Sequence, residues 1–238
     1  LLATGEIIAY LNADDAYRPG AFPEVARFFA ENRAARIVVG DCDYINTKSD
    51  IIGSLRAQYN RLEDLIRYWG WDKWYCIPQQ SVFWRRELLA EVGLFNPSLH
   101  MVMDYEMWLR VAQLTHIHVL NRTLAAFRLI PDSKTGGSTH LMYFEEFHTS
   151  KKYWARLPLR LRIRTMLNAN LHLSTKLLDV AEHFFLSGIR TETVPSLLKN
   201  SARHWPLYAF SPRLICTVAG VLAGTSPLER HIKKLHRQ

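Results

Sequence analysis

The stretch that decides the fold is Ile7-Ile8-Ala9-Tyr10-Leu11, which runs into the polar loop Asn12-Ala13-Asp14-Asp15 and on to a turn at Pro19-Gly20. An unbroken apolar run of this kind predicts a strand buried on both faces, as in a parallel sheet. In open α/β sheets, ligands bind just beyond the carboxyl ends of the strands. The loop after this strand is therefore where we expect chemistry.

The first residues suggest that the sequence begins inside a fold. There is no initiator Met, and Leu1 to Gly5 is typical of the last turn of a helix that stops at Gly5. A parallel strand also needs neighbouring strands and crossover helices. We therefore expect a fragment whose earlier strands are missing.

Helical and strand patterns alternate along the next hundred residues. Apolar spacing predicts helices over 21–32, 61–68, 85–92 and 103–112. Apolar or alternating runs predict strands over 37–45, 51–55, 78–84, 117–120 and 124–127. From Leu157 onward the spacing is helical throughout. The expected fold class is α/β, a mixed sheet lacking its first strands and followed by a helical C-terminal extension.

The composition excludes several classes of protein. Of 238 residues, 48% are hydrophobic and 22% are charged, which is typical of a globular protein and not of a disordered one. No apolar run reaches the ~20 residues that span a bilayer, and we expect no secretory signal, because no basic stretch precedes an apolar run at the start. The three cysteines form no CxxC pair, which favours a reducing compartment. We expect a cytoplasmic protein.

Charge is unevenly distributed. The chain has 30 Lys and Arg and 22 Asp and Glu; of these, 15 basic and 4 acidic residues fall in 151–238, which leaves 15 basic and 18 acidic in 1–150. This asymmetry predicts two regions with different partners, a domain at 1–150 and a basic helical region at 151–238. A basic surface suits anionic lipid or nucleic acid.

Asp14 and Asp15 are the first candidate site. Adjacent carboxylates after a buried strand suit a divalent cation such as Mg²⁺ or Mn²⁺, which takes one or two carboxylates and completes its shell with water and phosphate oxygens. The alternative is an ordinary turn, because Asp favours such loops and caps helices. Position alone does not separate the two.

Asp104 is the second candidate. It lies at the predicted start of a helix, where an acidic residue is stabilised as an N-cap or by the helix dipole. The alternative is a general base that takes a proton from an attacking hydroxyl, for which partial desolvation suits a carboxylate.

Taken together, three segments resemble family 2 glycosyltransferases. The run from Ala3 to Asp15 followed by Pro19-Gly20-Ala21-Phe22 resembles the family's strand and DxD-type acidic motif. Residues 78–86 and Val92-Gly93-Leu94-Phe95 resemble its acceptor-side strand and helix. Residues 103–110, Met-Asp-Tyr-Glu-Met-Trp-Leu-Arg, match the segment that holds the catalytic base. The resemblance covers about residues 1–135.

The resemblance implies a GT-A fold and an inverting, hexosyltransferase-type transfer of sugar from a nucleotide-activated donor. Asp14 and Asp15, with Asn12, would bind the metal that bridges the donor diphosphate, and Asp104 would deprotonate the acceptor hydroxyl. The acceptor would be a surface polysaccharide or a lipid-linked glycan. Residues implied to contact donor or acceptor are Gln79, Gln80, Trp84, Arg110 and Arg128, although the position of Arg110 along its helix favours a structural or phosphate-side charge.

This sequence departs from the family pattern at three places. Asn12 occupies the first acidic position, which keeps a carbonyl ligand but loses a charge. Ile130-Pro131 stands where a His often follows the last strand. The family's uridine-binding strand would lie upstream of Leu1, so we expect the 238 residues alone to be inactive.

Other features have two interpretations each. Trp69, Trp71 and Trp74 suit stacking on an acceptor sugar or packing in the core. His116 and His118 suit metal binding or a surface pair, and 134–138 suits a loop over a diphosphate or an ordinary loop.

The basic tail suggests a peripheral contact with an anionic membrane, or a solvated basic face. Two rivals to the enzyme remain: a non-catalytic remnant, and a nucleic-acid-binding module. The acidic front half and the lack of a nucleic-acid motif count against the second rival.

Overall fold

The computed structural model describes residues 3–67, 76–130, 139–187, 191–206, 215 and 217–219. The chain divides into two compact units, Leu1–Gly137 with Thr149–Tyr153, and Ser138–His148 with Trp154–Gln238. The predicted Trp69, Trp71 and Trp74 cluster, the loop 134–138 and the basic residues near the C-terminus lie outside the described residues.

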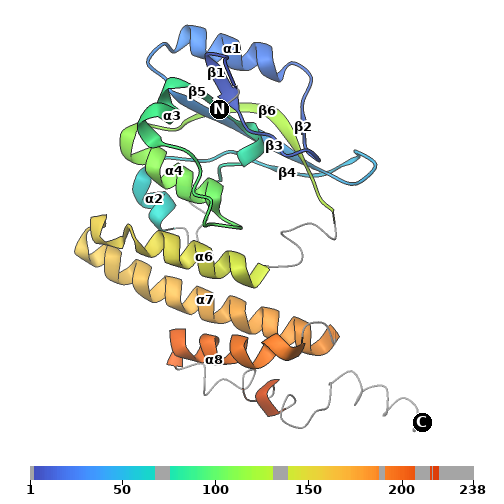
Figure 1. Cartoon of the computed structure of the whole chain (residues 1–238), viewed down its shortest axis with the longest axis vertical. Coiled ribbons are helices and arrows are strands. Elements are labelled where there is room, and N and C mark those ends of the chain that lie inside the picture. Colours follow the sequence, from blue (N-terminus) through green and yellow to red (C-terminus); the bar gives the residue numbers. More distant parts are fainter. Residues whose placement is uncertain are drawn as a thin grey trace. The chain divides into compact units, whose positions relative to one another are not determined.

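The first unit is built on a mixed sheet (Figure 1). Its strands are β1 (Ile7–Ala9), β2 (Ala16–Tyr17), β3 (Ile37–Ile45), β4 (Ile51–Leu55), β5 (Val82–Arg85) and β6 (His118–Arg128). Their order is β1-β5-β3-β6-β2, with β4 paired to β3. Only the pairing of β3 with β6 is parallel among these strands. The expectation of an α/β fold with a mixed sheet, as in GT-A proteins, is confirmed.

The parallel pair of β3 and β6 forms the middle of the sheet. Gly40 lies where the register between these strands shifts. A Cβ at this position would lie 2.6 Å from the backbone oxygen of Arg122 and 2.5 Å from the side chain of Leu124. The residue must therefore be glycine for the two strands to approach.

The sequence predicted two strands, 117–120 and 124–127, where the structure has the single strand β6. The polar residues between them, Asn121, Arg122 and Thr123, interrupted the apolar pattern. In the structure they are accommodated by the register shifts opposite Gly40 and Asp41, so the strand continues through them.

Helices cover both faces of the sheet (Figure 1). On one face, α1 (Ala21–Glu31) packs through Val25 and Phe29 into a core that includes Phe83 of β5. On the other face, Trp84 of β5 packs against Trp108 of α4 (Met103–Leu114), with ring centroids 5.4 Å apart. Successive side chains of β5 thus serve opposite layers, as strand geometry requires.

The remaining elements of this unit are short. They are α2 (Leu62–Ile66), η1 (Gln79–Ser81) and α3 (Glu87–Val92). The predicted helix at 61–68 is shorter than expected, and the predicted strand at 78–84 begins as one turn of 3-10 helix. As predicted, α3 stops at Gly93, which adopts a positive φ of 79°.

One prediction about β1 is wrong. We expected a parallel strand buried on both faces, but β1 pairs antiparallel with β5 at the end of the described sheet, and Ala9 is exposed. An apolar run does not reveal which partner a strand will find, because pairing depends on segments that are distant in sequence.

The second unit is helical, as the sequence predicted for the region after Leu157. It contains most of α6 (Thr139–Lys151), then η2 (Trp154–Arg156), α7 (Leu159–Ser187), η3 (Thr191–Thr193) and α8 (Val194–His204). Leu177 of α7 and Leu197 of α8 are buried, and the hydroxyl groups of Ser174 and Ser201 lie 3.0 Å apart between these helices. Among the described residues, we find no helix long and apolar enough to cross a bilayer.

The close approach at Gly40 leads to a first prediction. Gly40→Ala should lower the free energy of unfolding by about 2 kcal/mol or more, because backbone and side-chain atoms must shift to admit a methyl group. Gly53→Ala in β4 is the matched control, since its Cβ would meet Tyr44 at 3.4 Å, an ordinary contact. Urea unfolding of both variants measures the difference, and equal stability would contradict the prediction.

Candidate active site at the carboxyl edge of the sheet

The acidic loop after β1 is tied to the end of β6 by Asp15. One carboxylate oxygen of Asp15 accepts a hydrogen bond from Asn12 Nδ2 at 3.0 Å, and the other accepts the backbone N–H of Arg128 at 2.9 Å. The backbone N–H of Asp15 in turn donates to the carbonyl of Asn12 at 3.2 Å. Asp15 therefore fixes the shape of the loop.

Arg128 gathers three segments at the same place. Its guanidinium donates to the carbonyl oxygen of Asp14 at 2.9 Å, to that of Asn46 at 2.7 Å and to the hydroxyl of Ser49 at 3.1 Å. Because Asn46 and Ser49 belong to the turn between β3 and β4, Arg128 joins this turn to the acidic loop. We call this side of the sheet, where β1, β3 and β6 end, the carboxyl edge.

Asp14 differs from its neighbour. Its residue is exposed, and among the described residues no hydrogen bond or ion pair of its carboxylate is found. Its backbone is nevertheless held, through the carbonyl that Arg128 binds. Asp14 is thus a free carboxylate on an anchored loop.

The oxygen atoms of the acidic loop fit a divalent cation only if substrate phosphate oxygens complete its ligand shell. Within the parts of the chain that the structure describes, no cluster of three or more His, Cys, Asp or Glu side chains could hold a metal ion. Asp14 and the amide oxygen of Asn12 are hard oxygen donors, and Mg²⁺ binds through one or two carboxylates when substrate phosphates supply further ligands. The loop therefore fits an ion shared with a phosphate group, and does not form a complete cage.

Topology brings Asp104 to the carboxyl edge as well. Only residues 115–117 separate the end of α4 from the start of β6. The helix packs on the sheet through Trp108 and Trp84. Traced backward from the start of β6, it therefore crosses the sheet face toward the carboxyl ends of the strands. Twelve residues rise about 18 Å, which carries Asp104, in the first turn, away from the start of β6.

Aromatic contacts support this placement. The ring of Tyr10, two residues before Asn12, lies 5.6 Å from that of Phe95 in the segment leading into α4. Phe95 also lies 6.1 Å from Trp84. The segments that carry the two acidic centres thus meet beside the end of β1.

The environment of Asp104 alters its acidity. Desolvation by burial raises the pKa of this carboxyl above its ordinary value, although hydrogen bonds from backbone N–H groups act in the opposite direction. One of these comes from Tyr105, at 2.7 Å from the carboxylate oxygen. Asp104 is not the N-cap of α4, which is Val102.

The glutamines predicted to contact substrate lie at the same edge. Gln79 donates its side-chain N–H to the carbonyl of Tyr10, and Gln80 is buried. Trp84, by contrast, is a core residue, 3% exposed between Trp108 and Phe95. The structure therefore gives Trp84 a packing role.

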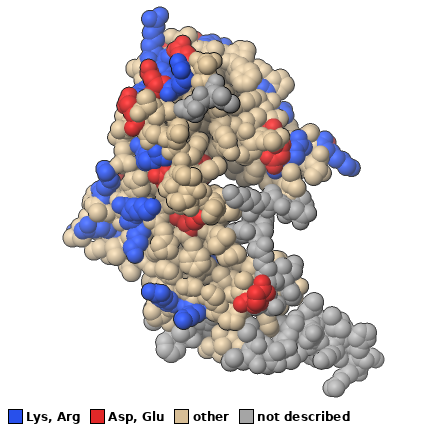
Figure 2. All heavy atoms as spheres, viewed as in Figure 1, with Lys and Arg blue, Asp and Glu red and all other residues tan. Residues whose placement is uncertain are grey.

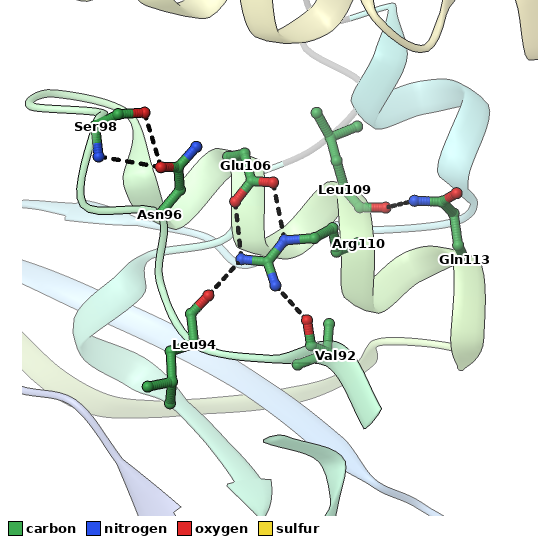
Figure 3. A network of polar contacts seen from close by, with 8 residues as sticks. All are labelled: Val92, Leu94, Asn96, Ser98, Glu106, Leu109, Arg110 and Gln113. Carbon is green, nitrogen blue, oxygen red and sulfur yellow. Dashed lines mark hydrogen bonds and ion pairs between the residues drawn. The ribbon is translucent and has the colours of Figure 1, made fainter. Parts of the chain in front are cut away.

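Arg110 lies in a structural network (Figure 3). Two of its nitrogens bind the Glu106 carboxylate, each at 2.8 Å, and the guanidinium also donates to the carbonyls of Val92 and Leu94. It thus fastens α4 to the chain that follows α3. Of the two roles considered for Arg110, the geometry supports the structural one.

His116 and His118 are close, with ring centroids 5.0 Å apart. His116 also lies against Tyr59 and His118 against Phe28. Burial, and then the neighbouring His116, lower the pKa of His118. The pair belongs to an aromatic packing cluster at the start of β6, away from the carboxyl edge.

Sequence analysis missed three contributors. Asn46 and Ser49 bind Arg128, and Glu106 holds Arg110. The spacing of Glu106 and Arg110, four residues apart on one helix, was a usable signal. The roles of Asn46 and Ser49 had no signal beyond the turn itself.

A mixed sheet between helical layers is similar to the GT-A fold. Residues 1–93 match the family model described as glycosyl transferase family 2. This part of the chain is therefore similar to family 2 glycosyltransferases, in agreement with the sequence resemblance. The match ends before α4 and β6, so Asp104 and Arg128 lie outside it.

A solved structure has a similar fold. The crystal structure of residues 1–349 of S. aureus TarS aligns with a TM-score of 0.50 and 14% sequence identity, covering 98% of this chain and 68% of that one. At this identity the likeness concerns the fold alone. No curated protein matches the sequence.

The network around Arg110 gives a second prediction. Arg110→Gln should lower the free energy of unfolding by about 2–3 kcal/mol, because it leaves the buried Glu106 carboxylate unpaired. The control is Arg36→Gln, which breaks a two-bond pair with the exposed Glu91 and should cost about 1 kcal/mol or less. If chemical denaturation gave both variants the same loss, the structural assignment would be wrong.

Proposed function

We propose that this protein transfers a sugar from a nucleoside-diphosphate donor to an acceptor hydroxyl, with inversion at the anomeric carbon. The observation that carries the proposal is the contact of Tyr10 with Phe95, because it brings together the segments that bear the free carboxylate of Asp14 and the desolvated carboxyl of Asp104. The family 2 domain supports glycosyl transfer in general.

On the donor side, Asp14 and the amide oxygen of Asn12 would hold a divalent cation together with the donor diphosphate. When bound, such an ion offsets the charge that develops on the leaving diphosphate. Asp15 acts as a positioning residue, since both its oxygens already accept hydrogen bonds that shape the loop. Arg128 adds a fixed positive charge beside the loop.

On the acceptor side, Asp104 would accept the proton of the attacking hydroxyl. The new bond forms between that oxygen and the anomeric carbon while the bond from the anomeric carbon to the diphosphate oxygen breaks. The proton passes to Asp104 and the nucleoside diphosphate leaves. A single displacement inverts the configuration and needs no protein nucleophile. A raised pKa makes the Asp104 carboxylate a better base than an ordinary aspartate.

The acceptor class follows from the sequence resemblance. We propose a hexosyl transfer to a surface polysaccharide or lipid-linked glycan, by a protein at the cytoplasmic side of a membrane. A non-catalytic remnant is the alternative, because Asn12 removes one charge from the acidic motif.

Asp104→Asn tests the base directly. We expect this substitution, made in the protein expressed in its native cells, to lower the rate of sugar transfer by about 10²–10⁴-fold, the usual contribution of a general base. The variant should be at least as stable as the parent at neutral pH. Burial raises the folded-state pKa, so stability is lost as pH rises from the ordinary carboxyl pKa through the raised value, and Asn removes that cost.

The same shift predicts the pH profile. Because Asp104 must be ionised to act, kcat/KM should fall on the acid side around a pKa above that of an ordinary aspartate, and Asp104→Asn should abolish this limb. Full turnover in the variant, or an unchanged profile, would show that Asp104 is not the base, whereas absence of sugar transfer by the parent protein would favour the non-catalytic alternative.

Substitutions of the two loop aspartates should have different effects, one on ligand binding and the other on stability. Asp14→Asn should weaken Mn²⁺-dependent binding of nucleoside diphosphates by about tenfold or more without changing the melting temperature, because it removes an exposed ligand. Asp15→Ala should lower stability by about 1–3 kcal/mol, because it strands the Arg128 N–H. Titration calorimetry with MnCl₂ and uridine or guanosine diphosphate, together with thermal unfolding, measures both. The reverse pattern would exchange the assigned roles.

A further inference from the structure

The first half of α7 carries an exposed apolar stripe. Leu159, Ile163, Met166 and Leu167 are 61%, 50%, 43% and 52% exposed. Their spacing of four, seven and eight residues places them on one side of the helix. Four large apolar side chains in a row are more than scattered exposure accounts for.

The same stripe continues, buried, into the second half of α7. There its members are Leu173, Leu177, Ala181 and Phe184, and α8 packs on this half of the helix. At the last residue of α8, the Nδ1 atom of His204 lies 3.0 Å from the side-chain oxygen of Asn170. Helix α8 therefore ends where the exposed half of the stripe begins.

Positive charge flanks the exposed half. Arg160 and Arg164 are exposed on one side of the stripe, and Arg162 lies on the other. Between residues 147 and 178 the sequence contains no Asp or Glu, and these three arginines have no ion-pair partner among the described residues. Figure 2 shows basic side chains on the left of the view, where α7 begins in Figure 1.

We propose that this patch, formed by Leu159, Ile163, Met166 and Leu167 with Arg160, Arg162 and Arg164, docks on an anionic lipid surface. An amphipathic helix lies in the plane of a membrane by burying its apolar side chains at the acyl boundary, while basic residues bind the headgroups. The patch has both components. The inference rests on α7 alone and is independent of sugar transfer.

The chemistry of the patch argues against three other binding partners: a second copy of the chain, residues 207–238 and a nucleic acid. A second copy of the patch would bring arginines against arginines. Residues 207–238 contain five Lys and Arg and one Glu, so their charge does not complement the three arginines either. A nucleic acid would match the charge but not the aliphatic side chains. An anionic bilayer matches both.

Vesicle sedimentation tests the proposal with the whole chain. It should bind vesicles of 70% phosphatidylcholine and 30% phosphatidylglycerol, but not pure phosphatidylcholine. Binding should weaken at high salt, which screens the arginine charges. Arg160→Gln with Arg164→Gln should weaken it by about fivefold for each charge removed. Ile163→Gln with Leu167→Gln should weaken it by about tenfold.

Matched controls lie in the same unit. Lys199→Gln with Arg203→Gln removes two exposed charges at the same spacing from α8, and Leu186→Gln removes an exposed leucine from the opposite side of α7. Both should bind anionic vesicles as the parent does. Circular dichroism should show unchanged helix content in every variant, since all the altered side chains are exposed.

Three results would overturn the proposal. The first is no preference for anionic vesicles. The second is an equal loss in the control variants, which would indicate a nonspecific charge effect. The third is light scattering that shows a dimer dissociated by Ile163→Gln with Leu167→Gln, which would make the patch a contact between copies.

Discussion

The parallel pairing of β3 with β6 is the constraint on which the first unit depends. Parallel strands cannot be joined by a tight turn, so the chain between them must cross back over the sheet, and α4 is the last part of that crossover. The helix ends just before β6 begins, which directs its first turn toward the ends of β1 and β3. The same pairing requires a glycine at position 40, where no side chain fits.

In the function that we propose, the carboxyl edge divides its acidic residues between structure and chemistry. Asp15 and Arg128 hold the loop, β6 and the β3–β4 turn together through hydrogen bonds. Asp14 is left exposed and Asp104 is desolvated, and these two states suit ion binding and proton transfer respectively. A flexible loop would lose that division, because neither carboxylate would have a fixed environment. The anchoring residues therefore matter as much as the reactive ones.

In the second unit, a single apolar stripe along α7 has two different environments. Along α7 one apolar stripe is covered by α8 over half its length and is exposed over the other half. Sequence periodicity identifies such a stripe, but it cannot distinguish a covered part from an uncovered one. The arginines alternate with apolar residues in the sequence and looked unsuited to a single amphipathic face. The fold resolves this, because it buries Thr165 and Ala169 on the remaining side of the helix.

Sequence alone determined the elements and the acidic candidates. Helix α1, strands β3 and β4, the stop at Gly93 and the family 2 resemblance all follow from local patterns, because apolar spacing and turn residues act over a few positions. Tertiary structure alone decided that β1 pairs antiparallel, that β6 is one strand and that Trp84 is a core residue. It also decided that Asp15 anchors while Asp14 is free. Each of these depends on partners in other elements of the chain, and no local pattern records which distant group will desolvate or hydrogen-bond a given side chain.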